Sequence, residues 1–284
     1  MQRREFLAAS IASAGVLAGS ASAQSALAPN RPITGRLKQS VCRWCFGGVS
    51  LETLCERSKA IGIQSVELLT EKEWHVPSQF GMTCAVAMGP TSIGNGYNRI
   101  DNHDKFTAES ERLLPLVKAA GIPNMIVFSG NRSGMDDAEG LKNCATGLKR
   151  ITPLAEKLGV TIIMELLNSK VDHKDYMCDR TRWGVDLVRE VGSPRFKLLY
   201  DIYHMQIMEG DVIRTITDHM DAIGHFHTAG VPGRQDLDQA QELNYRAICT
   251  AIAEKGFSGY LGQEFMPKGD PFEALKAAFE ICDV

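Results

Sequence analysis

Short apolar runs of strand length alternate along the chain with longer segments in which apolar residues recur every three or four positions. The run 160–166 (VTIIMEL) is typical of the first kind. In the segment 104–120, Leu113, Leu116 and Val117 recur with the spacing of one helix face. The pattern therefore predicts an alternation of buried strands and amphipathic helices.

The alternation continues from residue 39 almost to the C-terminus. It predicts strands at 39–45, 63–69, 83–88, 125–129, 160–166, 197–202, 222–227 and 259–264. It predicts helices at 51–61, 104–120, 136–158, 180–191, 211–220, 244–255 and 271–281. Strict alternation indicates an α/β fold with a parallel sheet, and roughly 250 residues without a break favour a single-domain (β/α)8 TIM barrel over residues 38–284. A doubly wound open sheet is the alternative, although no G-x-G-x-x-G follows the first predicted strand.

The first residues have a pattern of their own. Arg3 and Arg4 precede a weakly apolar run that ends in small residues at Ala23. This pattern predicts a twin-arginine signal peptide at 1–23, cleaved near Ala23, and an N-terminal extension at 24–37. It further predicts recognition by the twin-arginine export machinery and a periplasmic location; a disordered N-terminal helix is the alternative.

Composition narrows the function classes. The 284 residues are 44% hydrophobic and 23% charged, with 31 basic against 34 acidic side chains, so nucleic acid is not an expected partner. No later run approaches the roughly 20 apolar residues of a membrane span, and we expect no membrane anchor. The spacing of Cys42 and Cys45 is that of a redox pair, but both fall inside the first predicted strand, which argues against that use.

The last four predicted strands each end in a residue that can bind a metal ion: Glu165, Asp201, His227 and Glu264. Catalytic groups of a TIM barrel lie at the C-terminal ends of its strands, so these four side chains are expected to converge. Their three carboxylates and one imidazole favour one divalent ion, Mn²⁺ first, with Mg²⁺ or Co²⁺ as possibilities and Zn²⁺ less favoured. His225 lies on the same strand face, either behind the site or in the core.

Three segments carry a family resemblance: YDIYHMQIMEGD at 200–211, AGVPGR at 229–234 and GQEF at 262–265. They resemble the hydroxypyruvate isomerase family and, more broadly, the xylose isomerase-like TIM-barrel sugar isomerases and epimerases, over residues 38–284. The resemblance implies a divalent metal on the four residues above and an acid/base pair formed by Glu165 and Glu264. The strand-seven ligand is often glutamine in hydroxypyruvate isomerases, and His227 here is more similar to the ketose 3-epimerases.

Four further residues are candidates for substrate binding. The resemblance implies that His204 and Arg234 hold substrate oxygens, and it implies a possible homo-oligomer. Trp44, at the mouth of the first predicted strand, is expected to line an apolar side of the pocket or to pack in the core. Asn168, just after strand five, is expected to bind substrate or to stabilise its loop.

These residues suit proton transfer beside a carbonyl group. A metal ion stabilises the enediolate that forms, and carboxylates move the proton. We expect an isomerase or epimerase acting on a small keto-sugar or hydroxy-keto acid. A metal-dependent lyase or dehydratase of a keto-sugar or keto-glycoside needs the same residues and stays open. A non-catalytic periplasmic sugar-binding protein and an abasic-site endonuclease are more remote alternatives.

Overall fold

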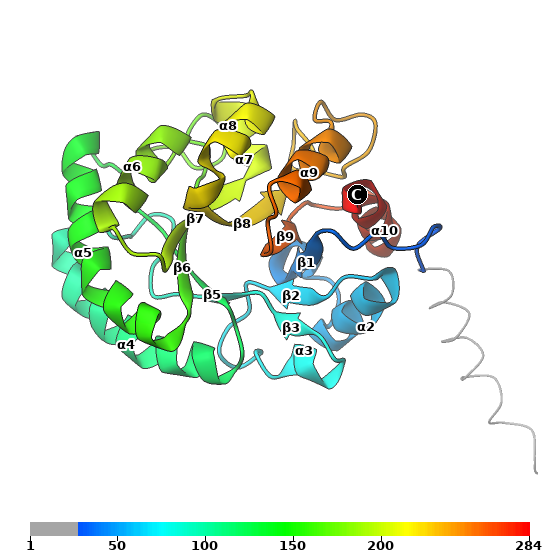
Figure 1. Ribbon diagram of the computed structural model, residues 1–284, viewed down its shortest axis with the longest axis horizontal. Coiled ribbons are helices and arrows are strands. Elements are labelled where there is room, and N and C mark those ends of the chain that lie inside the picture. The colour runs from blue at the N-terminus through cyan, green and yellow to red at the C-terminus, as the bar shows by residue number, and fades with distance from the viewer. Residues whose placement is uncertain (1–27) are drawn as a thin grey trace, which may run out of the picture.

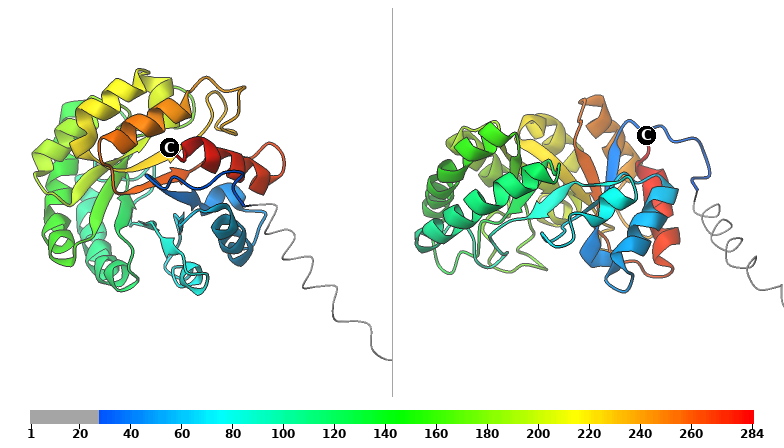
Figure 2. Two further views of the ribbon diagram at one scale, coloured as in Figure 1. Left: turned by 45° about the vertical axis from the view of Figure 1, so that its right-hand side comes forward. Right: turned by 90° about the horizontal axis from the view of Figure 1, so that it is seen from below.

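The described part of the chain, residues 28–284 of a computed structural model, forms a nearly closed barrel of nine parallel strands surrounded by helices (Figures 1 and 2). The strands are β1 (Lys38–Cys42), β2 (Ser65–Glu67), β3 (Thr83–Cys84), β4 (Val86–Met88), β5 (Asn124–Val127), β6 (Thr161–Glu165), β7 (Phe196–Asp201), β8 (Ile223–Thr228) and β9 (Tyr260–Gln263). Their order is β3-β2-β1-β9-β8-β7-β6-β5-β4. The barrel closes where Leu68 N donates to Val86 O at 2.9 Å.

The helices lie outside the strands, as Figure 2 shows from two further sides. They are α2 (Leu51–Ile61), α3 (Val76–Gln79), α4 (His103–Ala119), α5 (Asp137–Leu158), α6 (Thr181–Val191), α7 (Ile202–Met208), α8 (Val212–His219), α9 (Tyr245–Glu254) and α10 (Pro271–Cys282), with 3-10 turns η1 (Arg43–Phe46), η2 (Ile100–Asn102) and η3 (Met220–Ala222). Gly159 and Gly192 end α5 and α6 with φ of 72° and 71°, a conformation that favours glycine. Asp136 begins α5 by accepting hydrogen bonds from the N–H groups of Ala138 and Glu139.

The predicted TIM barrel is confirmed, with three local differences. The first strand ends at Cys42 rather than at residue 45, and Cys45 lies in η1, so the C-x-x-C segment is not wholly within a strand. The predicted strand 83–88 is divided at Ala85, because β3 pairs with β2 whereas β4 pairs with β5. Helices α3 and α7 were not predicted; α7 begins where Asp201 accepts a hydrogen bond from His204 N at 3.0 Å.

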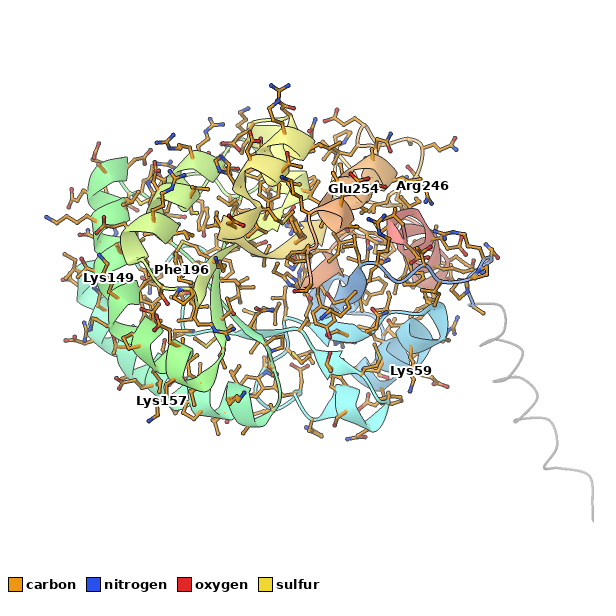
Figure 3. The ribbon with its side chains drawn as sticks, viewed as in Figure 1. Lys59, Lys149, Lys157, Phe196, Arg246 and Glu254 are labelled. Atoms are coloured by element: carbon orange, nitrogen blue, oxygen red, sulfur yellow. The ribbon has the colours of Figure 1, made fainter. Side chains whose placement is uncertain are left out.

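Charged side chains lie on the outer surface of the helices, and apolar side chains lie between the helices and the strands. The labelled charged residues in Figure 3 are exposed and lie on the peripheral helices: Lys59, Lys149, Lys157, Arg246 and Glu254. Phe196, on β7, is fully buried within the ring of helices. The core thus lies between the helices and the strands, while the barrel interior also holds a set of polar groups.

The segment before β1 packs on the last helix. Thr34 N and Gly35 N donate to the Asp283 carboxylate at 2.8 and 2.7 Å, and Arg31 forms a 3.2 Å ion pair with it. Asn30 N donates to Glu280 at 2.6 Å. The predicted signal peptide at 1–23 lies outside the described residues and stays a prediction.

Among the residues described, no helix has the length and apolar character needed to cross a membrane.

Candidate active site

Four side chains meet inside one end of the barrel, and they are the four predicted metal ligands. Glu165 ends β6, Asp201 ends β7, His227 lies near the end of β8 and Glu264 directly follows β9. These strands are neighbours in the sheet (Figure 1), and Asp201 is in register with His227. One ligand atom from each side chain lies within 4.8 Å of the ligand atoms of the other three, and all four residues are buried. Parallel strand ends therefore bring together residues that are up to 99 positions apart.

The two ring nitrogens of His227 both face carboxylates, and the contact with Glu67 fixes the orientation of the ring. Its Nε2 lies 2.7 Å from Glu67 Oε1, and its Nδ1 lies 2.8 Å from Glu264 Oε2 and 3.4 Å from Glu165 Oε1. A neutral imidazole that donates from Nε2 to Glu67 has a lone pair on Nδ1, aimed at two carboxylates. Such an arrangement needs a cation between the nitrogen and the oxygens, or a second proton on the ring.

Glu67 is the site residue that sequence reasoning missed. It ends β2, is fully buried, and reaches across the barrel interior to His227 and to His225, whose Nε2 is 3.0 Å from Glu67 Oε1. Ser40 Oγ donates to its other oxygen. Burial opposes the charge, but His225 and His227 hold the pKa of Glu67 well below its usual range. The signal was available, since Ser65-Val66-Glu67 places a carboxylate at the end of a buried strand just as β6 does.

The close approach of Glu67 and His227 depends on Gly262 in β9. A Cβ atom on residue 262 would lie 2.6 Å from Glu67 Oε1 and 2.8 Å from His227 Cδ2, which is closer than real Cβ contacts. A glycine inside a strand often marks such a close approach. The GQEF segment thus supplies both the space for this contact and the carboxylate of Glu264.

The buried polar atoms of the cluster fit a divalent cation. None of the described residues forms a hydrogen bond with Glu165 Oε1, Asp201 Oδ2 or His227 Nδ1, although all three atoms are buried. Burial, together with the charge of Glu264, raises the pKa of Glu165. Burial raises the pKa of Asp201 to about 8, despite the attraction of Arg234. We call the cluster of Glu165, Asp201, His227 and Glu264 the cage. Its three carboxylates carry more negative charge than the neighbouring Arg234 neutralises. Oxygen donors together with one imidazole suit an ion such as Mn²⁺.

Arg234 and Trp44 both bind Glu264. The indole Nε1 donates to Glu264 Oε1 at 2.7 Å, and Arg234 forms an ion pair with Glu264 and lies 3.5 Å from Asp201 Oδ2. Burial alone would raise the pKa of Glu264, but Arg234 and His227 lower it well below its usual range. The two glutamates of the cage therefore have their pKa values shifted in opposite directions, as is typical of an acid/base pair.

His204 and Asn168 form a buried pair beside the cage. Asn168 Nδ2 lies 2.7 Å from His204 Nδ1 and also donates to Asp172 at 2.6 Å. If Nδ1 accepts from the amide, Nε2 carries the proton. In residues 28–284, nothing lies within hydrogen-bond distance of Nε2, and Asp201 Oδ2 is 3.6 Å away. Burial and the charge of Arg234 lower the pKa of His204. The substrate-binding roles of both residues stay predictions, and the amide of Asn168 is already committed within its loop.

A cavity of about 470 Å³ opens beside the cage. Of the predicted site residues, Glu165, Glu264, Arg234 and Trp44 line it. His173, in the segment after β6, also lines it, and none of the described residues forms a hydrogen bond with its buried Nε2. The rest of the lining is mostly apolar: Leu68, Thr70, Met88, Ile93, Ile126, Phe128 and Leu167.

The parallel barrel and the buried cluster at its strand ends define a TIM-barrel protein with a candidate metal centre. Residues 55–282 match the family model described as the xylose isomerase-like TIM barrel, and the chain belongs to this family.

Known proteins of several activities are similar to this chain. A putative hydroxypyruvate isomerase of Mus musculus is 26% identical over 175 residues, which cover 60% of this chain and 63% of that protein. The structure of a family 2 AP endonuclease from Brucella melitensis has a TM-score of 0.77 at 22% identity, covering 84% of this chain and 97% of that one. The structure of a 3-keto-D-glucoside 4-epimerase from E. coli has a TM-score of 0.71 at 18% identity, covering 85% and 97%. At these identities the two structures show a shared fold alone.

Proposed function

We propose that this protein is a divalent-metal-dependent isomerase or epimerase of a small compound with a hydroxyl group beside a keto group. The convergence of three buried carboxylates and His227 Nδ1 within 4.8 Å carries this proposal. The similarity to a putative hydroxypyruvate isomerase and to a keto-glucoside epimerase supports it.

Glu165, Asp201, His227 and Glu264 would hold the ion, with Glu67 keeping the His227 ring in place. When bound, a divalent ion polarises the substrate carbonyl and stabilises negative charge on its oxygen. The partnerless atoms of the cage are the ones that would face it. A carboxylate behind a ligating imidazole is a common arrangement that fixes the ring and strengthens the ligand.

Glu165 is the better candidate for the base that removes the proton next to the carbonyl. Burial and the charge of Glu264 raise the pKa of Glu165, which improves its ability to accept a proton. Glu264, kept ionised by Arg234, would act from the other side, while Arg234 and the His204 Nε2–H would hold substrate oxygens. Return of a proton to the opposite face of the same carbon gives an epimer, and return to the neighbouring carbon gives an isomer.

Solvent isotope exchange tests this proposal. The Mn²⁺-loaded protein is incubated in D₂O with ketoses, keto-glucosides and hydroxypyruvate, and deuterium uptake and product mass are measured together. We expect uptake at the carbon next to the carbonyl, a product of unchanged mass apart from deuterium, and a loss of about 10²–10⁴-fold in Glu165→Gln.

The control is Glu111→Gln, which removes the charge of an exposed glutamate on α4 and should exchange at the wild-type rate. Full exchange in Glu165→Gln would remove Glu165 as the base. A product that has lost part of its mass would instead favour the lyase alternative. A wild-type protein that exchanges none of these compounds would contradict the proposal.

A further inference from the structure

The cavity beside the cage has two unlike walls. Glu165, Glu264 and Arg234 form the wall over β6, β8 and β9. Across from them the lining comes from β2, β4 and β5 and the segments that follow these strands, and it is apolar: Leu68, Met88, Ile93, Ile126 and Phe128. Ile126 and Phe128 are 1% and 6% exposed, so little water reaches their surface except through the cavity. A molecule bound at the cage must place its far end against this apolar wall.

Apart from the metal ion proposed at the cage, the described residues that line the cavity offer no spare positive charge to such a molecule. Among the described residues that line it, Arg234 is the one with a permanent positive charge, and it already pairs with Glu264 at 2.5 Å and lies 3.5 Å from Asp201. Burial and the charge of Arg234 lower the pKa of His173, which disfavours a positive charge on its ring. A substrate carboxylate on the apolar wall would be desolvated without a partner, which is costly.

The neutral polar groups of the cavity suit hydroxyl and ether oxygens instead. Thr70 lines the cavity, and His173 Nε2 has no hydrogen-bond partner among the residues that the structure describes. The Trp44 side chain is 45% exposed although its Nε1 is bound to Glu264, so part of its ring is free to contact a planar or apolar group. These features fit a ligand that is polar at one end and apolar at the other.

Building on the proposed function, we propose that the substrate is a neutral α-hydroxyketone with an apolar substituent, such as a keto-sugar bearing an alkyl or aromatic group, and not a keto acid. The reacting hydroxyketone lies at the cage, and the substituent packs on the wall formed by Leu68, Met88, Ile93, Ile126 and Phe128.

Three compounds of the form HOCH₂–CO–R test this preference, because only R differs. In dihydroxyacetone R is CH₂OH, in hydroxypyruvate it is a carboxylate, and in 2-hydroxyacetophenone it is a phenyl ring. Calorimetry on the Mn²⁺-loaded protein measures each dissociation constant. We expect the phenyl compound to bind about tenfold more tightly than dihydroxyacetone, because the ring buries apolar surface. Hydroxypyruvate is expected to bind at least about tenfold more weakly than dihydroxyacetone.

A variant locates the effect on the apolar wall. Met88→Lys introduces a cation of similar length into β4 and should reverse the order, favouring hydroxypyruvate over the phenyl compound. Leu116→Lys, at a position on α4 that is 39% exposed and outside the cavity lining, is the matched control and should keep the wild-type order.

Two readouts separate this inference from the proposed function. Equal affinities, or tightest binding of hydroxypyruvate to the wild type, would overturn the substrate preference even if all three compounds exchange their CH₂ protons with D₂O. An unchanged order in Met88→Lys would overturn the placement of the substituent. Absence of exchange in all three, with the expected order of affinities, would count against the enzyme mechanism and leave the binding preference supported.

Discussion

The two halves of the barrel mouth are built from the same strand-and-helix unit but carry opposite chemistry. Strands β6 to β9 carry Glu165, Asp201, His227 and Glu264 at or next to their C-terminal ends, whereas the cavity lining from β4, β5 and the residue after β5 consists of Met88, Ile126 and Phe128. The strand pairs are parallel in both halves, so strand direction does not distinguish them. The difference between the halves therefore comes from the side chains at the strand ends. In the proposed function, the half formed by β6 to β9 binds the metal and reacts, and the other half shapes the cavity beside it.

Glu67 is the exception that joins the halves. It ends β2, on the side of the barrel that otherwise gives apolar lining, yet its carboxylate supports His227 from behind. Glu67 is itself hydrogen-bonded to Ser40 and His225 inside the barrel. The two halves of the mouth thus differ in their side chains but share this group of polar residues beneath them.

Removal of the metal should have the largest effect of all the changes considered, and it acts on the half of the mouth formed by β6 to β9. Dialysis against a chelator is expected to abolish isotope exchange, and Mn²⁺ should restore it. Ligand binding to the folded state alone stabilises it by about 2.7 kcal/mol at 100 times the dissociation constant, so the unfolding temperature should rise with Mn²⁺ concentration in a thermal scan. Full activity after chelation would contradict the account.

Gly262→Ala should disturb the contact that joins the halves. The new Cβ would meet Glu67 Oε1 and His227 Cδ2 at 2.6 and 2.8 Å. We expect a loss of about 1–3 kcal/mol in the free energy of unfolding, measured by urea titration, because the overpacked site must shift. Mn²⁺ affinity should fall as well, toward the 100-fold end of the range of about 10–100-fold seen for supporting residues.

Gly269 provides the control for this substitution. A Cβ atom there meets nothing within 4 Å, and its backbone has no left-handed φ. Gly269→Ala should leave both stability and Mn²⁺ affinity unchanged. Equal behaviour of the two variants would show that Gly262 is not needed for the close approach.

Glu67→Gln should weaken the metal site while leaving its four ligands in the sequence. The neutral amide no longer supports the His227 ring with a charge, so Mn²⁺ is expected to bind about 10–100-fold more weakly by calorimetry. Glu71→Gln is the control, because Glu71 is 47% exposed and pairs with Arg112 on the surface. A wild-type affinity in Glu67→Gln would mean that the ring is held by packing alone.

Ile126→Val should have the smallest effect of these substitutions. It tests whether a change in the apolar half leaves metal binding by the other half unaffected. It removes one methylene from the apolar wall, which costs about 0.5–1.5 kcal/mol of stability. Mn²⁺ affinity should not change, because Ile126 lies on β5, outside the four strands that carry the predicted ligands. A parallel loss of metal affinity would show that the two halves do not act separately.

Much of the fold followed from local patterns. The segment 51–61 has the bounds of α2, because it is bounded by Ser50 and Gly62 and keeps one helical spacing of apolar residues. The run 160–166 covers β6, because it is a continuous apolar run of strand length. The division at Ala85 depends on two different neighbouring strands and has no local signal.

The site was predictable where it needed only the ends of adjacent strands. Glu165, Asp201, His227 and Glu264 meet for that reason. Glu67 could not be placed in the same way, because β2 meets β8 only across the barrel interior, with β1 and β9 between them in the sheet. The apolar wall could not be predicted from the sequence either, because an apolar residue such as Met88 or Ile126 near the end of a strand is equally typical of a core position.

A titration of the metal-free protein with Mn²⁺, followed by electron paramagnetic resonance, tests the metal centre most directly. The account predicts one tightly bound ion per chain, whose binding is lost in His227→Gln and kept, with reduced affinity at most, in His225→Gln, although both histidines contact Glu67. Absence of a tight site in the wild type, or a wild-type titration in His227→Gln, would contradict it.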